Sequence, residues 1–410
     1  MTRLLLAVAS GVLLVACSDS EQTKREHFAS ANKFMEAGKP QEAIVEYRNA
    51  LRADGKFGEA RAKLSEAYQA VGNANQAFRE AVRAADLLPL DNAAQLRAAN
   101  FLILAGRFED AKTRIQPVID RDPANVEAQL ILGNALVGLK DLDGAIREIE
   151  EAIKLDPGRA QTYTSLAAVR AQQGDRDQAK AAFEKAVEVD PKSIVARLAL
   201  AYFRWTGADV AGAEEALKGA AAVDPKNALA NRAIAAFYVG TNRAEMAEPY
   251  LKALAASGTP AAVLQLADYY LSVRRVTEAA AVLEPLTKDK ATASAAETRL
   301  AAIAYNGNEK ARGHSMLDAV IAREPANVQA LLLKAQWLMA ERKPQEALQR
   351  AKAAVKADPR SVAAHYYSGL AHDVLRQRKE AMASFNEVLK INPRVAAAQV
   401  QLSRLNLLEG

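Results

Sequence analysis

The chain has 410 residues, of which 50% are hydrophobic, only 6% are aromatic and one is cysteine. Abundant Ala, Leu, Glu, Lys and Arg with few Gly and Pro predict helix throughout, and a single cysteine excludes a disulfide scaffold and a four-cysteine metal site. The 54 basic and 49 acidic side chains leave a net charge of +5, which is too evenly mixed to indicate a nucleic-acid-binding protein.

The first 16 residues have the pattern of a secretory signal. Arg3 precedes an apolar run over residues 4–16, which is shorter than the roughly 20 residues of a membrane span and typical of a signal peptide. The run ends in Leu14, Val15, Ala16 and Cys17, a tetrapeptide that resembles the lipobox of bacterial lipoproteins. The alternative is an ordinary signal peptide with an incidental cysteine.

The lipobox resemblance implies where the protein resides. Residues 1–16 are then removed, and Cys17 becomes the N-terminus and carries covalent lipid, the only cofactor-like group that the sequence predicts. Ser18 at the next position is similar to lipoproteins sorted to the outer membrane of Gram-negative bacteria. Residues 17–23, which comprise Cys17 and the polar residues that follow, are predicted to form a short, unstructured tether, so the folded body is expected close to the periplasmic face of that membrane.

A period of 34 residues runs through the remaining chain. It is first visible in the prolines, namely Pro89, Pro123, Pro157, Pro191, Pro225, Pro325, Pro359 and Pro393. With proline set at position 32, eleven units begin at residues 24, 58, 92, 126, 160, 194, 228, 260, 294, 328 and 362. Position 8 is Ala, Gly or Ser in every unit, and position 20 is Ala in all units except one, where it is Gly313.

This pattern over residues 24–395 resembles the tetratricopeptide repeat. The resemblance implies an all-α, right-handed superhelical solenoid of about eleven pairs of antiparallel helices, A and B. Small residues at positions 8 and 20 allow the two helices to cross closely, and proline at position 32 ends helix B. Residues at position 34 are predicted to cap the next helix A, namely Asp91, Asn125, Ser193, Asn227, Asn327 and Ser361, whereas Arg159 breaks this pattern.

Two departures from the period predict an internal boundary. The unit at 228 is two residues short and ends in Ser257-Gly258-Thr259-Pro260, and the next unit lacks its proline. The sequence therefore favours an N-terminal block over residues 24–259 and a C-terminal block over residues 260–395. A last helix within residues 396–410 is predicted to cap the array, with Leu402, Leu405, Leu407 and Leu408 on its outer face.

The sequence contains no recognisable catalytic or phosphate-binding motif. His365 and His372 share a helix face, but no third ligand lies near them, so packed histidines are favoured over a metal site. We therefore predict that the chain is not an enzyme and binds no metal.

The informative surface is the inner groove that helix A lines in this kind of repeat, at positions 2, 5, 9 and 12. Polar and aromatic side chains at these positions are the candidate binding residues, because aromatic residues concentrate at binding hot spots. They are Asn100, Asn134, Tyr202, Trp205, Asp268, Tyr305 and Gln336. Packing roles for Tyr202 and Trp205 are the alternative.

Such grooves bind proteins or peptides, and the chain is therefore expected to be a protein-binding scaffold anchored to the membrane through its lipid alone. Its layout is similar to repeat lipoproteins that accompany exopolysaccharide export and exosortase (PEP-CTERM) systems. Lipoproteins of outer-membrane secretion or pilus assembly are the sibling alternative. A glycan-binding groove that uses Tyr202, Trp205 and Tyr305 as stacking platforms is a further hypothesis.

Overall fold

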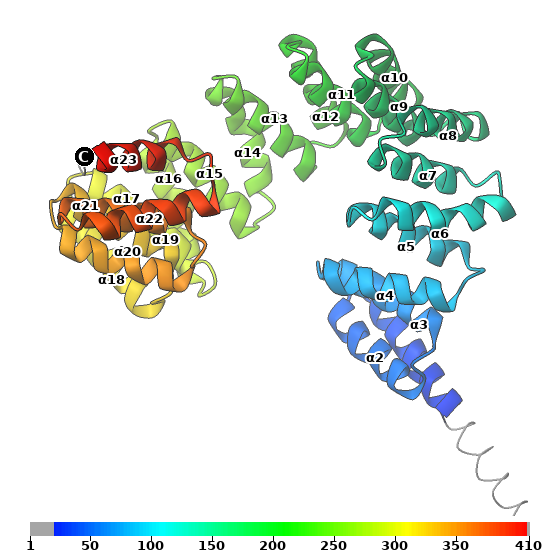
Figure 1. The fold of residues 1–410 in the computed structure, drawn as a ribbon, viewed down its shortest axis with the longest axis horizontal. Helices are drawn as coiled ribbons and strands as arrows, with labels where there is room; N and C mark the ends of the chain where they lie inside the picture. Colours follow the sequence, from blue (N-terminus) through cyan, green and yellow to red (C-terminus); the bar gives the residue numbers. More distant parts are fainter. Residues whose placement is uncertain (1–19, 408–410) are drawn as a thin grey trace, which may run out of the picture. The chain divides into compact units, whose positions relative to one another are not determined.

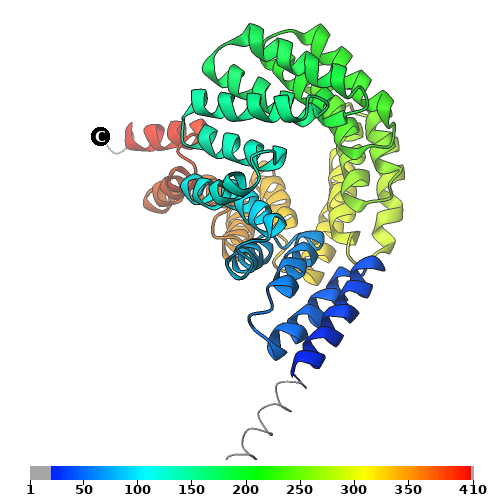
Figure 2. The ribbon, with the colours of Figure 1, turned by 90° about the vertical axis from the view of Figure 1, so that its right-hand side faces the viewer.

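The computed structural model describes residues 20–407, and within this range every regular element is a helix. The prediction of an all-α protein is therefore confirmed. The chain divides into two compact units between Val223 and Asp224. In each unit, consecutive helices lie side by side in chain order (Figures 1 and 2).

The first unit contains six A–B helix pairs. It begins with a helix over residues 20–36. The helices that follow are α2 (Pro40–Ala53), α3 (Gly58–Ala70), α4 (Ala74–Leu87), α5 (Asn92–Leu104), α6 (Phe108–Arg121), α7 (Val126–Gly138), α8 (Leu142–Leu155), α9 (Ala160–Gln173), α10 (Arg176–Val189), α11 (Ile194–Thr206) and α12 (Val210–Val223).

The second unit contains five helix pairs and one further helix. Two of its B helices are interrupted by short 3-10 segments, η1 and η2. Its elements are α13 (Ala228–Gly240), η1 (Ala244–Ala247), α14 (Glu248–Ala255), α15 (Pro260–Ser272), α16 (Val276–Leu283), η2 (Glu284–Lys288), α17 (Ala293–Asn306), α18 (Lys310–Arg323), α19 (Val328–Ala340), α20 (Pro344–Ala357), α21 (Val362–Val374), α22 (Arg378–Ile391) and α23 (Ala396–Leu407).

The small residues at positions 8 and 20 are buried in all eleven repeats. The glycines among them show why size matters there. A Cβ added at Gly133 would lie 2.8 Å from Ile149 Cγ1, and one at Gly369 would lie 2.7 Å from the ring of Phe385. Position 8 of helix A therefore meets position 24 of helix B at a distance that a larger side chain would increase.

The ends of the helices follow the predicted register. All six predicted capping residues accept a hydrogen bond from a backbone N–H in the first turn of the next helix A, whereas Arg159 does not. Pro40 and Pro344 occupy the first turn of α2 and α20, where a missing N–H leaves no bond unmade. These caps satisfy donors that the helix itself leaves unpaired.

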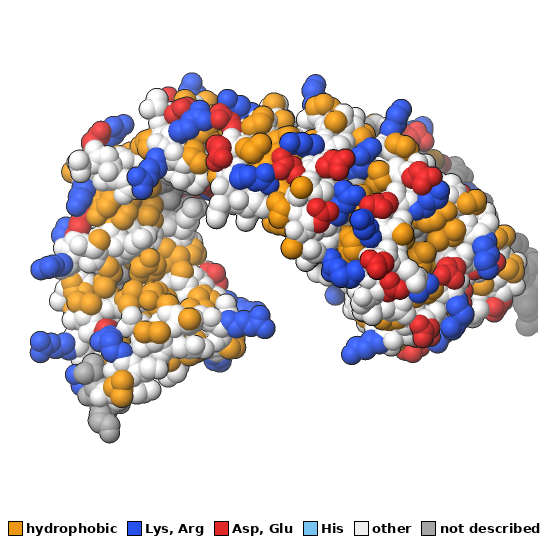
Figure 3. Space-filling model, turned by 90° about the horizontal axis from the view of Figure 1, so that it is seen from above, with side chains coloured by type: hydrophobic (Ala, Val, Ile, Leu, Met, Phe, Trp, Pro, Cys, Tyr) orange, Lys and Arg blue, Asp and Glu red, His pale blue; other side chains and the backbone are white. Residues whose placement is uncertain are grey.

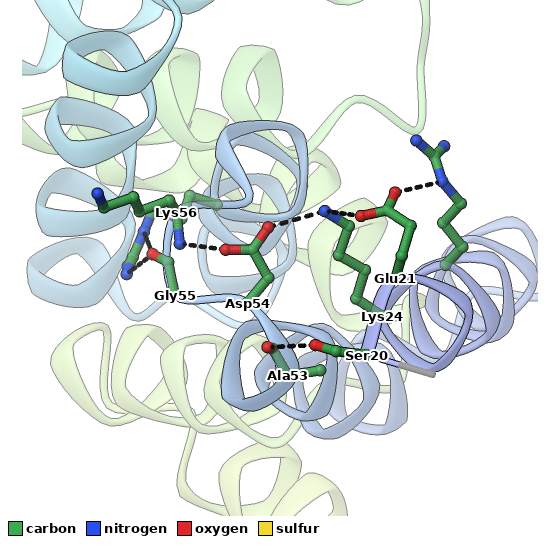
Figure 4. Close-up of polar contacts among 9 residues, drawn as sticks. Ser20, Glu21, Lys24, Ala53, Asp54, Gly55 and Lys56 are labelled. Carbon is green, nitrogen blue, oxygen red and sulfur yellow. Dashed lines mark hydrogen bonds and ion pairs between the residues drawn. The ribbon is translucent and has the colours of Figure 1, made fainter. Parts of the chain in front are cut away.

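Of the predicted unstructured tether, the part that the structure describes, residues 20–23, is helical. Ser20 Oγ donates to the carbonyl of Ala53 at 3.0 Å, and Lys24 Nζ lies 2.8 Å from Asp54 Oδ2 and 2.5 Å from Glu21 Oε2 (Figure 4). Contacts with the turn after α2 thus hold the first turn of the helix. Residues 1–19, which include the proposed signal peptide and Cys17, lie outside the described range.

Two B helices of the second unit are irregular. Pro249 stands at the junction of η1 and α14, and Pro285 stands at the start of η2. Each proline lacks the N–H that would continue the helical bonding. Helices α14 and α15, on either side of residues 257–260, pack on each other.

The predicted C-terminal capping helix is present as α23, but its faces are not arranged as expected. Leu402 and Leu405 are buried together with Ala398 against α22, while Leu407 is 83% exposed. The expectation that Leu402 and Leu405 lie on the outer face was wrong, because these residues are spaced to face the preceding helix. Leu408 lies outside the described residues.

Candidate binding groove

Three successive A helices of the first unit enclose a hollow of about 360 Å³. Helix α5 supplies Ala93, Leu96 and Asn100, which stand at positions 2, 5 and 9 of their repeat. Gln69 of α3 and Glu127 of α7 complete the walls. The positions of helix A that the repeat pattern predicts to line a groove thus line a concave surface in these three repeats. We call this hollow the α5 hollow.

The amide side chains of Asn100 and Asn134 stand at the same position of adjacent repeats. Asn100 is exposed and Asn134 is half-buried. Neither side chain has a hydrogen-bond partner among the residues that the structure describes. An amide offers both a donor and an acceptor, which is what an extended peptide backbone requires at each residue.

The α5 hollow also contains features that the sequence did not identify. Leu104, at position 13, is 83% exposed at its rim, and a large exposed apolar side chain beside a polar wall is typical of a binding surface. Arg97 Nη1 lies 2.6 Å from Glu66 Oε1 and donates to the carbonyl of Ala62 at 3.1 Å. Arg97 follows Glu66 by three residues less than one repeat. This spacing in the sequence could have predicted the ion pair.

The charge of Glu66 is maintained by its neighbours. Burial alone would raise the pKa of its carboxyl group, but hydrogen bonds from Lys63 and Arg97 outweigh burial and hold the pKa below its ordinary value. The carboxylate is therefore ionised and neutralised locally. It restrains Arg97 at the wall of the α5 hollow without adding a free negative charge there.

A second hollow, of about 830 Å³, lies between α9 and α11 in the same unit. Gln161 and Thr164 of α9 and Val195 of α11 line it, again at positions 2 and 5. Val195 is 65% exposed, and Tyr202, farther along α11, is 68% exposed. Trp205, on the next turn, is only partly exposed, and no described contact joins either aromatic side chain to Asn134.

The remaining candidates belong to the second unit, and two of them are occupied by intramolecular contacts. Both carboxylate oxygens of Asp268 accept hydrogen bonds from Arg299, at 2.6 and 2.8 Å. The ring of Tyr305 stacks on Trp337 with a centroid distance of 4.1 Å, and the ammonium group of Lys310 lies 5.4 Å from its centroid. Tyr305 is therefore not a free stacking platform. Gln336 is exposed.

The stacked pair of Tyr305 and Trp337 belongs to a cluster that the sequence did not reveal. His314 meets both rings edge-on, and its Nε2 lies 2.8 Å from Glu341 Oε1. Hydrogen bonds, first from His314 and then from Lys343 and Tyr305, lower the pKa of Glu341 to about 2 despite partial burial. Trp337 is only 5% exposed, so the cluster is part of the packing between repeats.

The other histidines of the second unit do not form a ligand set. His365 Nε2 contacts the carbonyl oxygen of Pro359 at 3.0 Å, and buried His372 pairs with Gln377 through Nδ1 at 2.6 Å. Within residues 20–407 no cluster of three or more His, Cys, Asp or Glu side chains is placed to hold a metal ion. None of the helices in that range combines the length and apolar character of a membrane span.

Comparison with solved structures finds helical repeat proteins of low sequence identity. MamA of Desulfovibrio magneticus RS-1 is 20% identical and aligns over 42% of this chain and 97% of its own, with a TM-score of 0.38. TTC0263 of Thermus thermophilus, described as a thermophilic TPR protein, is 21% identical over 44% and 99%, with a TM-score of 0.41. Yeast Tom70 is 16% identical over 95% and 89%, with a TM-score of 0.46.

No curated protein sequence matches the chain. Family models of the tetratricopeptide repeat match residues 102–160, 160–193 and 333–396. The match to residues 160–193 has the same limits as the unit that begins at residue 160 in the proline register, and the same register describes every other helix pair of the structure. Residues 102–193 and 333–396 are therefore tetratricopeptide repeats.

Proposed function

We propose that the chain is a protein-binding scaffold of the bacterial cell envelope, in which the groove of the first unit holds an extended segment of a partner protein. The observation that carries this proposal is the unpartnered amide of Asn100 in the wall of the α5 hollow, with a second unpartnered amide, Asn134, at the same position of the next repeat. The family supports the proposal, because tetratricopeptide repeats are protein-interaction modules.

The chemistry of the α5 hollow suits an extended peptide. Amides one repeat apart can each pair with a backbone N–H and C=O of the bound segment, because such a segment leaves these groups unpaired. Leu96 and Leu104 offer apolar contact to one side chain of the peptide, and Glu127 and Arg97 lie at the walls. Backbone pairing provides affinity and the apolar contact provides selectivity.

The setting of the scaffold rests on residues 1–17. We propose that Cys17 carries lipid and that the protein is held at the periplasmic face of the outer membrane of a Gram-negative bacterium. The role that best fits this setting is assembly or export of the exopolysaccharide or PEP-CTERM type, and outer-membrane secretion or pilus assembly is the alternative. What supports the anchor is that the only cysteine of the chain stands where an apolar signal run ends.

Site-specific photo-crosslinking in the native cell tests the groove. A benzophenone amino acid at Leu104 is expected to crosslink a discrete partner that mass spectrometry identifies. The same probe at Val45, which is 56% exposed on the B helix α2, is the matched control. Asn100→Ala with Asn134→Ala should reduce the crosslink at Leu104 about tenfold without unfolding the helices, since alanine favours helix. Equal crosslinking at Val45, or no effect of the double substitution, contradicts the proposal.

The anchor is tested separately. Cys17→Ser is expected to move the protein from the membrane fraction to the soluble fraction, because lipidation requires the thiol. Metabolic labelling with an alkyne fatty acid should mark the wild type and not the variant. Failure to label the wild type removes the anchor and leaves the groove proposal untouched.

A further inference from the structure

The turns that join helix A to helix B have a left-handed residue at position 15 in all eleven repeats. In the first unit four of the six are glycines, Gly38, Gly72, Gly106 and Gly174, and the others are Lys140 and Ala208. In the second unit none is glycine. The five residues there are Asn242 (φ 56°), Arg274 (62°), Asn308 (68°), Arg342 (59°) and Arg376 (60°).

Left-handed backbone is unfavourable for a residue with a Cβ, and asparagine tolerates it better than arginine does. Three arginines at this position therefore destabilise the folded chain relative to glycine. Residues in such conformations cluster at functional sites, so these side chains are candidates for a role beyond folding.

The next position of the same turns shows the same trend. In the first unit four of the six residues there, Asn73, Asp141, Asp175 and Asp209, accept a hydrogen bond from the N-terminal turn of helix B, whereas Lys39 and Arg107 do not. In the second unit the position holds Arg243, Arg275, Glu309, Lys343 and Gln377, and none of these side chains caps its helix. The second unit has thus exchanged helix caps for mostly basic side chains.

The result is a basic edge. The five three-residue A–B turns of the second unit contain six Lys or Arg and two Asp or Glu residues, whereas its B–A turns contain four of each. Because successive pairs are antiparallel, all A–B turns lie along one edge. Figure 3 shows Lys and Arg side chains at the margins of the second unit, on the left of that view, around a largely apolar face with few acidic groups.

The acidic residues of these turns are already neutralised. Glu341 contacts His314 and Lys343, and Glu309 contacts Arg312 at 2.8 Å. By contrast, Arg274, Arg342 and Arg376 are exposed, and their side chains have no ion-pair or hydrogen-bond partner within residues 20–407. We name these three residues the arginine row.

We propose that the arginine row binds an acidic segment of a partner protein, on a surface separate from the groove. The planar guanidinium group matches a carboxylate with two parallel hydrogen bonds. Arg342 and Arg376 stand on neighbouring repeats, about 10 Å apart, which an extended chain crosses in about three residues. Arg274 stands two repeats before Arg342, with Asn308 between them, and this step corresponds to about six residues. A segment with Asp or Glu at about every third residue thus places carboxylates in register with the row.

A single line of cations suits a chain-like partner better than a flat one. An anionic membrane attracts a broad patch of excess positive charge, but the turns at the opposite edge carry balanced charge. The partner expected from this pattern is therefore an extended acidic protein segment.

Binding of a fluorescent poly-L-glutamate peptide to the full-length chain tests the proposal. The triple variant R274G/R342G/R376G should bind about tenfold more weakly, since each exposed charge pair contributes a few-fold, and it should melt at a higher temperature because glycine suits the left-handed turns. The matched control K290A/R360A/R394A removes the same charge from the opposite edge and should keep wild-type affinity.

Either of two results would overturn the proposal. If both triple variants weaken binding equally, only net charge matters and the arginine row is not a site. If phosphatidylglycerol vesicles bind the wild type more tightly than poly-L-glutamate does, the edge serves a membrane and not a protein. The groove variants N100A/N134A should leave poly-L-glutamate binding unchanged, so this proposal and the proposed groove function fail independently.

Discussion

Glycine at position 8 of a repeat stands where helix A passes closest to its own helix B. At Gly369 an added Cβ would lie 2.7 to 3.0 Å from three atoms of the Phe385 ring. Phe385 is fully buried and belongs to the core shared by α22 and α23, so its ring has little room to move. The amino acid at this single position therefore sets the spacing of the helix pair.

Gly369→Ala is expected to destabilise the protein by on the order of 1–2 kcal/mol, because overpacking outweighs the better helix propensity of alanine. Phe385→Leu shortens the ring side chain and should recover part of the loss in the double variant. Urea unfolding of the two single variants and the double variant measures the coupling. Gly55→Ala, whose Cβ would meet nothing closer than 3.8 Å, is the control and should be neutral; purely additive losses at 369 and 385 would refute the contact.

At the residue scale the sequence revealed less than the structure. The four glycines at position 15 are recognisable because glycine prefers left-handed turns. Arg274, Arg342 and Arg376 adopt the same conformation although their type opposes it. The tertiary arrangement of each helix pair imposes this backbone, and only the repeat register, applied without regard to residue type, could have identified it.

At the scale of the helix, caps distinguish the repeats. Six of the residues at position 34 accept a backbone hydrogen bond from the following helix A, but Arg159 before α9 makes none. The backbone of Arg159 is already extended, with φ −95° and ψ 100°, which is similar to Asn125 before α7. The geometry for a cap is thus present, and only the side chain is unsuitable.

Arg159→Asn is therefore expected to stabilise the protein by about 0.5–1 kcal/mol, the usual contribution of an N-cap. The reverse change, Asn125→Ala, should cost about 1 kcal/mol. Thermal unfolding of both variants measures the effect, and Arg159→Ala controls for removal of the charge. A melting temperature for Arg159→Asn that does not exceed that of Arg159→Ala would contradict the cap.

Proline shows why helix interruptions were only partly predictable. Pro117 and Pro285 occupy the same position, 26, of their repeats. The α-helix continues through Pro117 in α6, whereas a 3-10 segment begins beside Pro285. Helix α6 is followed by the usual Asp122-Pro123 ending, and the repeat with Pro285 lacks it. Proline at position 26 is therefore not sufficient to predict an interruption of helix B. The sequence at the end of the helix decides whether the α-helix continues.

At the scale of the whole molecule, the repeat register predicted which helix faces line hollows better than it predicted which side chains on those faces are already paired within the protein. Positions 2, 5 and 9 of helix A do line hollows in the first unit. The seven candidate residues nevertheless belong to two units, and Asp268 and Tyr305 are engaged within the second. Periodicity identifies a face of a helix, but only coordinates reveal which side chains on that face are already paired.

The second unit also carries the strongest acid-sensitive contacts. The pKa of Glu248 is lowered to about 2, first by its hydrogen bond with Arg275 and then by those with Lys252 and Tyr270; Glu341 is lowered equally, first by His314. A carboxyl whose folded pKa is depressed stabilises the protein above its unfolded pKa, and this contribution is lost as pH falls through the folded pKa.

We expect the second unit to lose stability between about pH 5 and pH 2, by on the order of 1–2 kcal/mol for each partly exposed glutamate. Trp337, which is buried in the second unit, reports this unit by fluorescence once Trp205 is replaced by Phe. Glu248→Gln should lower stability at pH 7 and weaken its dependence on pH. Exposed Glu380→Gln is the control, and an equal effect of the two substitutions would contradict the assignment.

The last helix has a consequence for assembly between copies. In a tandem array each repeat presents one face to the next, and an uncovered final face would recruit the first repeat of another molecule and extend into a fibre. In α23 the positions that correspond to His365, Gly369 and His372 of α21 hold Gln399, Ser403 and Asn406, all exposed. Where another helix B would dock, α23 thus presents amide and hydroxyl groups, and the cost of removing their water disfavours docking of another copy on this face.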